Sequence, residues 1–228
     1  MVSMFPHLSD NRSMISESAD FKPPSNLYCS NKMGRVLLKV LQEIMLRDDY
    51  SNLLNSAGLA QYSQALPEDN WTKSFDFVFF AKLNQGLSEM YGPRGGRRLG
   101  LLAGRSFLTH GLNEFGPLAG INDLARRTVP LQIKLRDGLT VVARLFSQTG
   151  DQNTWLEEQE MQFNYHVEQC PVCWGRTADK PICFFTVGFL QEVSYRLSDG
   201  CDFRVQETSC TAMGESSCVF RIDREPIK

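Results

Sequence analysis

The apolar residues of this chain change their spacing at about Trp155. Before that point they recur every three or four positions, as in the segment 34–47, which is the period of an amphipathic helix. From Trp155 to Val167 they alternate instead, which is the period of a half-buried strand. A chain that carries both patterns must pack helices against a sheet.

Applied along the whole chain, the same criteria predict a helical half followed by a small α/β unit. Expected helices cover 34–47, 50–64, 75–92, 97–116, 130–148 and 183–197, and expected strands cover 155–167, 201–210 and 217–223. Residues between 116 and 130 are taken as a linker. Gly100, Gly104 and Gly111 would permit close packing of one helix.

The N-terminal residues have a different composition from the rest. Residues 1–32 are rich in Ser, Asp, Asn and Pro and predict a mobile tail, so the domain is expected to span 33–228. Within it we expect a helical part over 33–150 and a cysteine-rich α/β part over 151–225. The fold class is α/β in the α+β sense: a helical N-terminal half packed on a small antiparallel sheet with a C-terminal helix.

Charge and hydropathy exclude some classes of function. The net charge of −2 lacks the basic excess of a nucleic-acid-binding protein. No apolar stretch reaches the ~18–20 residues that span a bilayer, although peripheral association with a membrane stays open. The N-terminus has no signal-peptide pattern, which predicts a cytoplasmic location. Seven cysteines in a reducing compartment indicate metal or redox chemistry before disulfides.

Four of the chemistry-bearing residues are expected to meet at a C-terminal hairpin. Alternation places Glu207 on the apolar face of its strand, where a carboxylate is costly unless a cation meets it. Cys210 and Cys218 flank the turn, and Cys183 is expected in the first turn of the last helix. Three thiolates and a carboxylate suit zinc. The alternative is that these cysteines are buried apolar side chains and that Glu207 pairs with a neighbouring arginine, either Arg204 or Arg221.

These residues carry a family resemblance. The order Cys183, Gly188, Glu207, Cys210, Gly214, Cys218 and Phe220 resembles the end of the 4-vinyl-reductase-type (4VR) domain, specifically from about residue 160 to 223. The resemblance implies a 4VR-like fold, whose phenol-sensing members bind structural zinc through three Cys and one Glu. Carried over, those ligands are Cys183, Glu207, Cys210 and Cys218.

The segment CPVCWGR departs from the sensor pattern. Cys170 and Cys173 form a Cys-x-x-Cys pair just ahead of Cys183. The pair could be a redox dithiol, an additional metal-ligand pair, part of an iron–sulfur site, or two reduced cysteines in a tight turn. Cys29 and Cys201 are treated as bystanders.

The resemblance also implies a function. Domains of this family enclose a hydrophobic pocket, and the positions comparable to the sensors' ligand contacts are His110, Phe163 and Tyr165. We therefore expect a binding protein for a hydrophobic small molecule, with a tetrapyrrole or (bacterio)chlorophyll precursor as the preferred ligand, working as a homodimer. One alternative is a 4-vinyl reductase, or its accessory, using an iron–sulfur cluster. The other is an assembly or scaffold factor for a photosynthetic complex.

Overall fold

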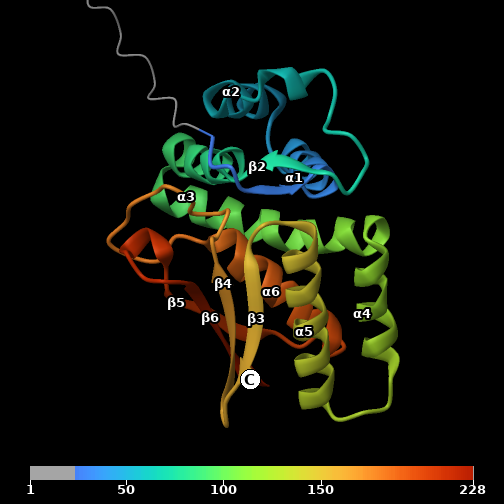
Figure 1. The fold of residues 1–228 in the computed structure, drawn as a ribbon. Helices are drawn as coiled ribbons and strands as arrows, with labels where there is room; N and C mark the ends of the chain where they lie inside the picture. Colours follow the sequence, from blue (N-terminus) through green and yellow to red (C-terminus); the bar gives the residue numbers. More distant parts are fainter. Residues whose placement is uncertain (1–23, 228) are drawn as a thin grey trace, which may run out of the picture.

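The computed structural model describes residues 24–227, except for the side chains of Pro117 and Ala119. A long helix, α3, runs across the middle of the molecule. It separates an N-terminal helical layer from a four-stranded sheet and the remaining helices (Figure 1). The predicted combination of helices and antiparallel sheet is confirmed. The helices are α1 (Asn31–Ile44), α2 (Arg47–Ala57), α3 (Phe77–Glu114), α4 (Gly116–Arg126), α5 (Leu131–Thr149) and α6 (Phe184–Leu197), with short 3₁₀ turns η1 (Ala60–Ser63) and η2 (Thr211–Met213).

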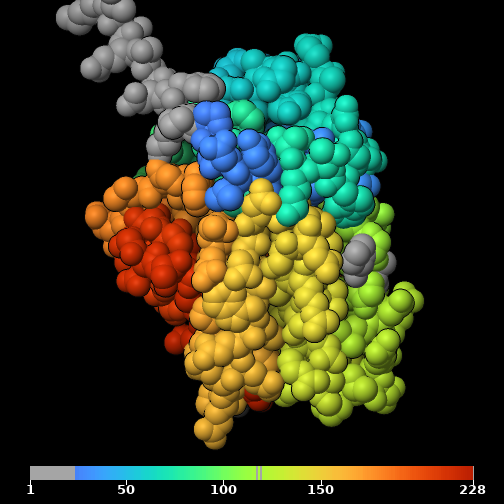
Figure 2. Space-filling model, viewed as in Figure 1, coloured from blue at the N-terminus to red at the C-terminus, as the bar shows by residue number. Residues whose placement is uncertain are grey.

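The strands form two antiparallel sheets. β1 (Tyr28–Ser30) pairs with β2 (Lys73–Asp76). The larger sheet has the order β3-β4-β6-β5, formed by β3 (Asn153–Glu158), β4 (Gln162–Glu168), β5 (Phe203–Ser209) and β6 (Cys218–Pro226). The pairing sets Val167 opposite Cys218 and Tyr165 opposite Phe220, so the inward side chains of the two central strands share one buried face. Figure 2 shows β3 and α5 side by side on the surface of the molecule.

The long alternating segment forms two strands instead of the single strand predicted. β3 and β4 are joined by a hairpin turn, and Gln159 N–H donates to the carbonyl of Gln162 across it. Met161 was expected on the buried face, but at this turn it is 71% exposed. Phe163, Tyr165 and Val167 are buried as predicted.

Two further boundaries differ from the sequence predictions. The residues taken as a linker contain α4, which buries Leu118 and Ile121. The end of the predicted tail is ordered: residues 28–30 form β1, and α1 begins at Asn31 because the Ser30 hydroxyl accepts a hydrogen bond from the Met33 N–H. The remainder of the predicted tail, 1–23, lies outside the described residues.

The helix α3 bends where the sequence predicts a stop. Gly92 has a φ of 70° and a ψ of 173°, followed by Pro93, so two helical halves meet at a kink. The second half crosses α6 closely: a Cβ on Gly104 would lie 2.0 Å from the Phe185 carbonyl oxygen, and one on Gly188 would lie 2.1 Å from that of Leu101. Close packing of the glycine-rich helix is thus observed, and it positions α6 over the sheet.

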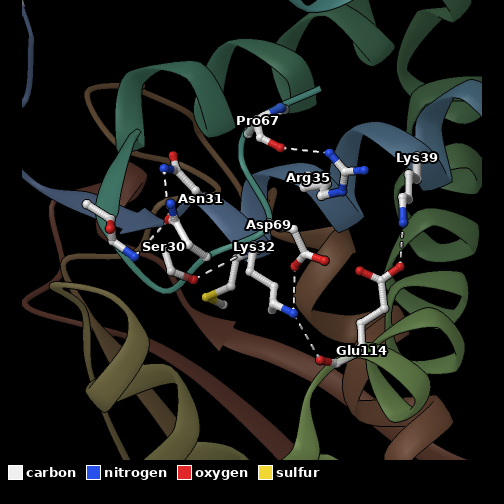
Figure 3. A network of polar contacts seen from close by, with 11 residues as sticks. Ser30, Asn31, Lys32, Arg35, Lys39, Pro67, Asp69 and Glu114 are labelled. Carbon is white, nitrogen blue, oxygen red and sulfur yellow. Dashed lines mark hydrogen bonds and ion pairs between the residues drawn. The ribbon is translucent and has the colours of Figure 1, made fainter. Parts of the chain in front are cut away.

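Polar contacts at α1 connect the N-terminal layer to the end of α3 (Figure 3). The ammonium of Lys39 lies 2.6 Å from Glu114 Oε1, and that of Lys32 lies 2.6 Å from Asp69 Oδ1. Arg35 donates to the carbonyl of Pro67. These contacts hold the 67–70 loop and the end of α3 on the same face of α1.

No helix within residues 24–227 combines the length and the hydropathy needed to cross a bilayer.

Candidate metal centre and apolar cavity

Five buried cysteines gather beside one end of the large sheet. Cys170 and Cys173 lie in the loop after β4, and Cys183 caps the N-terminus of α6. Cys210 follows β5, and Cys218 begins β6. Each is at most 1% exposed, and each is a free thiol. Thus three separate segments, 170–173, 183 and the β5–β6 hairpin, bring their sulfur atoms to one place.

Three of these sulfurs form a nearly equilateral triangle. The Sγ atoms of Cys183 and Cys210 are 3.9 Å apart, those of Cys183 and Cys218 are 3.8 Å apart, and those of Cys210 and Cys218 are 3.9 Å apart. A carboxylate oxygen of Glu207 completes a group of four ligand atoms that all lie within 4.8 Å of one another. The structure therefore brings together the four residues singled out by the family resemblance.

The Glu207 carboxylate is held but only half satisfied. Its Oε2 accepts a hydrogen bond from the Cys183 N–H at 2.7 Å, whereas its Oε1 is buried with no hydrogen-bond partner. An unsatisfied buried oxygen costs about 1–3 kcal/mol unless a donor or a cation meets it. The alternative pairing with arginine does not occur, since both Arg204 and Arg221 pair with Asp223.

Electrostatics at this site favour a cation. Burial raises the pKa of Glu207 to about 9, and burial likewise raises the pKa of the Cys183 thiol. A dipole at the N-terminus of α6 therefore does not by itself make Cys183 a thiolate. A bound metal ion would reverse these shifts, because it stabilises the ionised ligands directly.

The Cys-x-x-Cys pair joins a second, overlapping group. Cys170, Cys173, Cys183 and Cys218 also have their sulfurs within 4.8 Å of one another. Cys170 Sγ lies 3.8 Å from Cys183 Sγ, and Cys173 Sγ lies 3.5 Å from Cys218 Sγ. The pair is therefore part of the same centre as the hairpin cysteines.

Neighbouring groups support the sulfurs. The Thr211 N–H donates to Cys218 Sγ at 3.3 Å, and the Thr211 hydroxyl lies 3.0 Å from Cys173 Sγ. The loop that carries Cys173 is tied to the hairpin by the Ala178 N–H, which donates to the Ala212 carbonyl. Such contacts orient metal ligands in proteins. In this structure they join the two ligand-bearing loops.

An apolar cavity lies next to the cysteines. It has a volume of about 470 Å³ and is narrow, between α1, α3, α5, α6 and β4. Aromatic side chains form most of its wall, and Cys170, Pro171 and Val172 form one side. Its full lining is Cys29, Met33, Phe80, Phe107, Phe146, Gln152, Tyr165, Val167, Cys170, Pro171, Val172, Phe185, Thr186 and Phe189. The loop that contributes Cys170 to the cysteine centre is thus also a wall of the cavity.

Tyr165 is the one member of the predicted ligand-contact set that lines this cavity. Its side chain is 1% exposed, and its hydroxyl has no hydrogen-bond partner. Phe163 is buried on the same strand but lies under the guanidinium of Arg224, 4.7 Å from its ring centre, and not in the cavity lining. His110 lies on α3 near the surface, where Nε2 is 2.9 Å from Glu43 Oε2.

The two cysteines set aside as bystanders have different positions. Cys201 is exposed in the turn between α6 and β5. Cys29 is 1% exposed and lines the cavity, because β1 places it against the core. The short apolar run that contains Cys29 was hidden within a polar tail, so periodicity could not indicate it.

Comparisons with known proteins agree with this architecture. Residues 163–224 match the family model of the 4-vinyl-reductase (4VR) domain. No curated protein matches the chain. Among solved structures, the Fe(II) unliganded H-NOX protein from K. algicida is similar, with a TM-score of 0.57, 11% identity, and coverage of 87% of this chain and 97% of that chain.

Two further H-NOX structures show the same arrangement. An H-NOX protein mutant from S. oneidensis has a TM-score of 0.53 at 11% identity, covering 87% of this chain and 97% of that one. The H-NOX from Shewanella woodyi has a TM-score of 0.50 at 17% identity, covering 86% and 94%. At such identities the likeness concerns the fold alone. The segment 163–224, which contains the cysteine centre and strands β5 and β6, is therefore a 4VR domain within an α+β fold similar to that of the H-NOX proteins.

Proposed function

We propose that this protein binds a small, mostly apolar molecule in the cavity lined by Tyr165, and that a structural zinc ion stabilises the wall of that cavity. The observation that carries the ligand is the Tyr165 hydroxyl, a buried polar group without a partner in an apolar lining. Ligand pockets in proteins combine this kind of apolar wall with a few polar groups that orient the ligand. An aromatic alcohol of phenol size has both the shape and the hydrogen-bonding group that Tyr165 requires.

Zinc is supported by the spacing of the thiols. Zn–S bonds of about 2.3 Å in tetrahedral geometry place neighbouring sulfurs about 3.8 Å apart. The triangle of Cys183, Cys210 and Cys218 has edges of 3.8–3.9 Å, and Glu207 supplies the fourth ligand through its unpartnered oxygen. An iron–sulfur cluster, which the reductase alternative requires, contains several irons and bridging sulfides and spreads its cysteines further apart. The compact arrangement favours single ions.

The cysteine loop connects the two parts of the proposal. Cys170, Pro171 and Val172 line the cavity, while Cys170 and Cys173 belong to the cysteine centre. Metal binding would fix this loop and thereby the shape of the pocket. The metal in this proposal has a structural role and takes no part in a reaction.

A heme does not fit the described residues. One of the similar structures concerns heme distortion in the H-NOX family. In this chain His110 pairs with Glu43 and His166 pairs with Glu157, both outside the cavity lining, so neither described histidine is placed to hold an iron. The cavity is also narrow. A tetrapyrrole would therefore have to widen the pocket, and it serves as a competing ligand in the test.

The test is ligand binding by the zinc-loaded chain, measured by calorimetry. Phenol, benzene and a metal-free porphyrin serve as probes. Saturable phenol binding that weakens in Tyr165→Phe, together with weaker benzene binding, supports the proposal. Porphyrin binding without phenol binding would replace it with a tetrapyrrole carrier, and binding of none of the three would contradict it. Assembly as a homodimer and association with a membrane surface also stay proposals, for light scattering and vesicle co-sedimentation.

A further inference from the structure

The cysteine centre contains more ligands than one ion can use. Two groups of four ligand atoms are present, and they share Cys183 and Cys218. Together they contain six different residues, five cysteines and Glu207. A single tetrahedral ion would take four of these and leave two buried ligands without a role.

Two tetrahedral ions account for all six residues. If Cys183 and Cys218 each bond to both ions, the four remaining ligands divide evenly. Cys170 and Cys173 complete the first ion, and Glu207 and Cys210 complete the second. The shared pair must then form a common edge of two tetrahedra, and its sulfur–sulfur distance of 3.8 Å equals the edge expected for zinc, about 3.8 Å.

The outer ligands lie at matching distances from the shared pair. On the first side, Cys170 Sγ is 3.8 Å from Cys183 Sγ and Cys173 Sγ is 3.5 Å from Cys218 Sγ. On the second side, Cys210 Sγ is 3.9 Å from both shared sulfurs. Each outer thiol therefore contacts a bridging thiol at about the length of a tetrahedral edge.

Charge also favours two ions. Five thiolates and one carboxylate are costly to bury when ionised, and one divalent cation leaves most of that charge uncompensated. The nearest cation is the half-buried Arg176, whose charge interacts with Cys183, Cys173 and Cys210. A second divalent ion beside this guanidinium brings the centre close to neutrality.

The backbone around the Cys-x-x-Cys segment is built to turn inward. Gln169 has a φ of 53° and Gly175 has a φ of 64°, so the loop bends at both ends. Both of its sulfurs are buried in consequence. A left-handed Gln169 is an uncommon conformation for a residue with a Cβ, and such strain persists only where the surrounding structure requires it.

We propose that the six residues form a binuclear zinc centre in which Cys183 and Cys218 bridge two ions. This rests on the proposed function above, which places one zinc at Cys183, Glu207, Cys210 and Cys218. The new element is the second ion, held by Cys170 and Cys173 with the same bridging pair. The centre would clasp the wall of the cavity to the β5–β6 hairpin through shared thiolates.

The test is the zinc content of the full chain, purified under reducing conditions and dialysed against metal-free buffer. We expect about two zinc ions per chain in the wild type and about one in the Cys170→Ser, Cys173→Ser double variant. Cys201→Ser, the exposed cysteine, is the matched control and should keep both. X-ray absorption at the zinc edge should show metal–metal scattering in the wild type alone.

The other outcomes separate the two proposals. One ion in both the wild type and the double variant overturns the second ion but leaves the first site intact. One ion in the wild type and none in the double variant overturns both assignments, since the ion would then use the Cys-x-x-Cys pair. No zinc in either removes the proposed structural zinc as well. If the double variant fails to fold, the wild-type zinc content and its scattering still decide the question.

Discussion

Cys183 and Cys218 lie 3.8 Å apart, sulfur to sulfur, and belong to both groups of metal-ligating atoms. One caps helix α6 and the other begins strand β6, so they are far apart in sequence and adjacent only in the fold. A shared pair of this kind predicts that removing either thiol affects the whole centre. The remaining cysteines should have smaller, separable effects.

Cys218→Ser should therefore abolish zinc binding. The substitution removes a ligand from both groups, and loss of structural metal should lower the free energy of unfolding by roughly 3 kcal/mol or more. Zinc analysis and denaturant unfolding check this. Cys201→Ser is the control and should change neither quantity, because Cys201 is exposed and outside both groups. Wild-type zinc content in Cys218→Ser would exclude this ligand set.

Glu207→Gln should weaken zinc binding without harming the metal-free fold. The substitution removes the charge but keeps an oxygen, and we expect a fall in zinc affinity of ~100-fold or more. Burial raises the pKa of Glu207 to about 9, so the metal-free protein already holds this carboxyl protonated at neutral pH. Its unfolding free energy should therefore change by less than about 1 kcal/mol. A competition assay with a zinc chelator measures the first quantity, and urea unfolding measures the second.

Glu157→Gln is the matched control for that experiment. Glu157 is on β3, where it accepts from Asn164 and contacts His166. Equal loss of zinc affinity in both variants would mean that surface charge, and not coordination, governs the effect of Glu207.

Tyr165→Phe should weaken binding of phenol by about 1–3 kcal/mol, or roughly 5- to 150-fold, because the ligand loses its only proposed hydrogen-bond partner. The stability of the ligand-free protein should stay the same or rise, since an unsatisfied buried hydroxyl is removed. Tyr50→Phe offers a close control: its hydroxyl is also buried without a partner, but it does not line the cavity. Calorimetric titrations should separate the two variants, and identical affinities would place the ligand elsewhere.

Gly104→Ala should destabilise the fold by roughly 2–4 kcal/mol. The added Cβ would lie 2.0 Å from the Phe185 carbonyl oxygen, so α3 and α6 would have to move apart. Gly120→Ala in α4 is the control, because a Cβ there meets nothing within 4 Å and alanine favours helix. Thermal unfolding of both variants checks this. Equal melting temperatures would show that the crossing of the two helices is loose.

Removing zinc with a chelator should weaken phenol binding as well as stability. The wall formed by Cys170, Pro171 and Val172 would lose its anchor, so the pocket would become less well defined. Trp174, which packs edge-on against Phe77, should report the change through its fluorescence. Ligand affinity that does not depend on zinc would show that metal centre and cavity act independently.

The sequence by itself determined the types of the elements and the composition of the cysteine hairpin. The alternation in β5 and β6 follows from burial of one face of a strand, and it placed Glu207 on the buried face in advance. Periodicity is a local property, so local errors followed where it changed abruptly. The single strand predicted from Trp155 proved to be a hairpin, and the short helix α4 was taken for a linker.

Only the tertiary structure decided which distant residues meet. It placed Cys29 in the cavity and left His110 beside Glu43, because these positions depend on how β1 and α3 pack and not on the residues that flank them. It also joined Cys170 and Cys173 to the hairpin cysteines, although their separation from Cys218 in sequence gives no indication of distance in space. Residue chemistry and spacing specify what a segment can form, and long-range packing specifies which segments share a site.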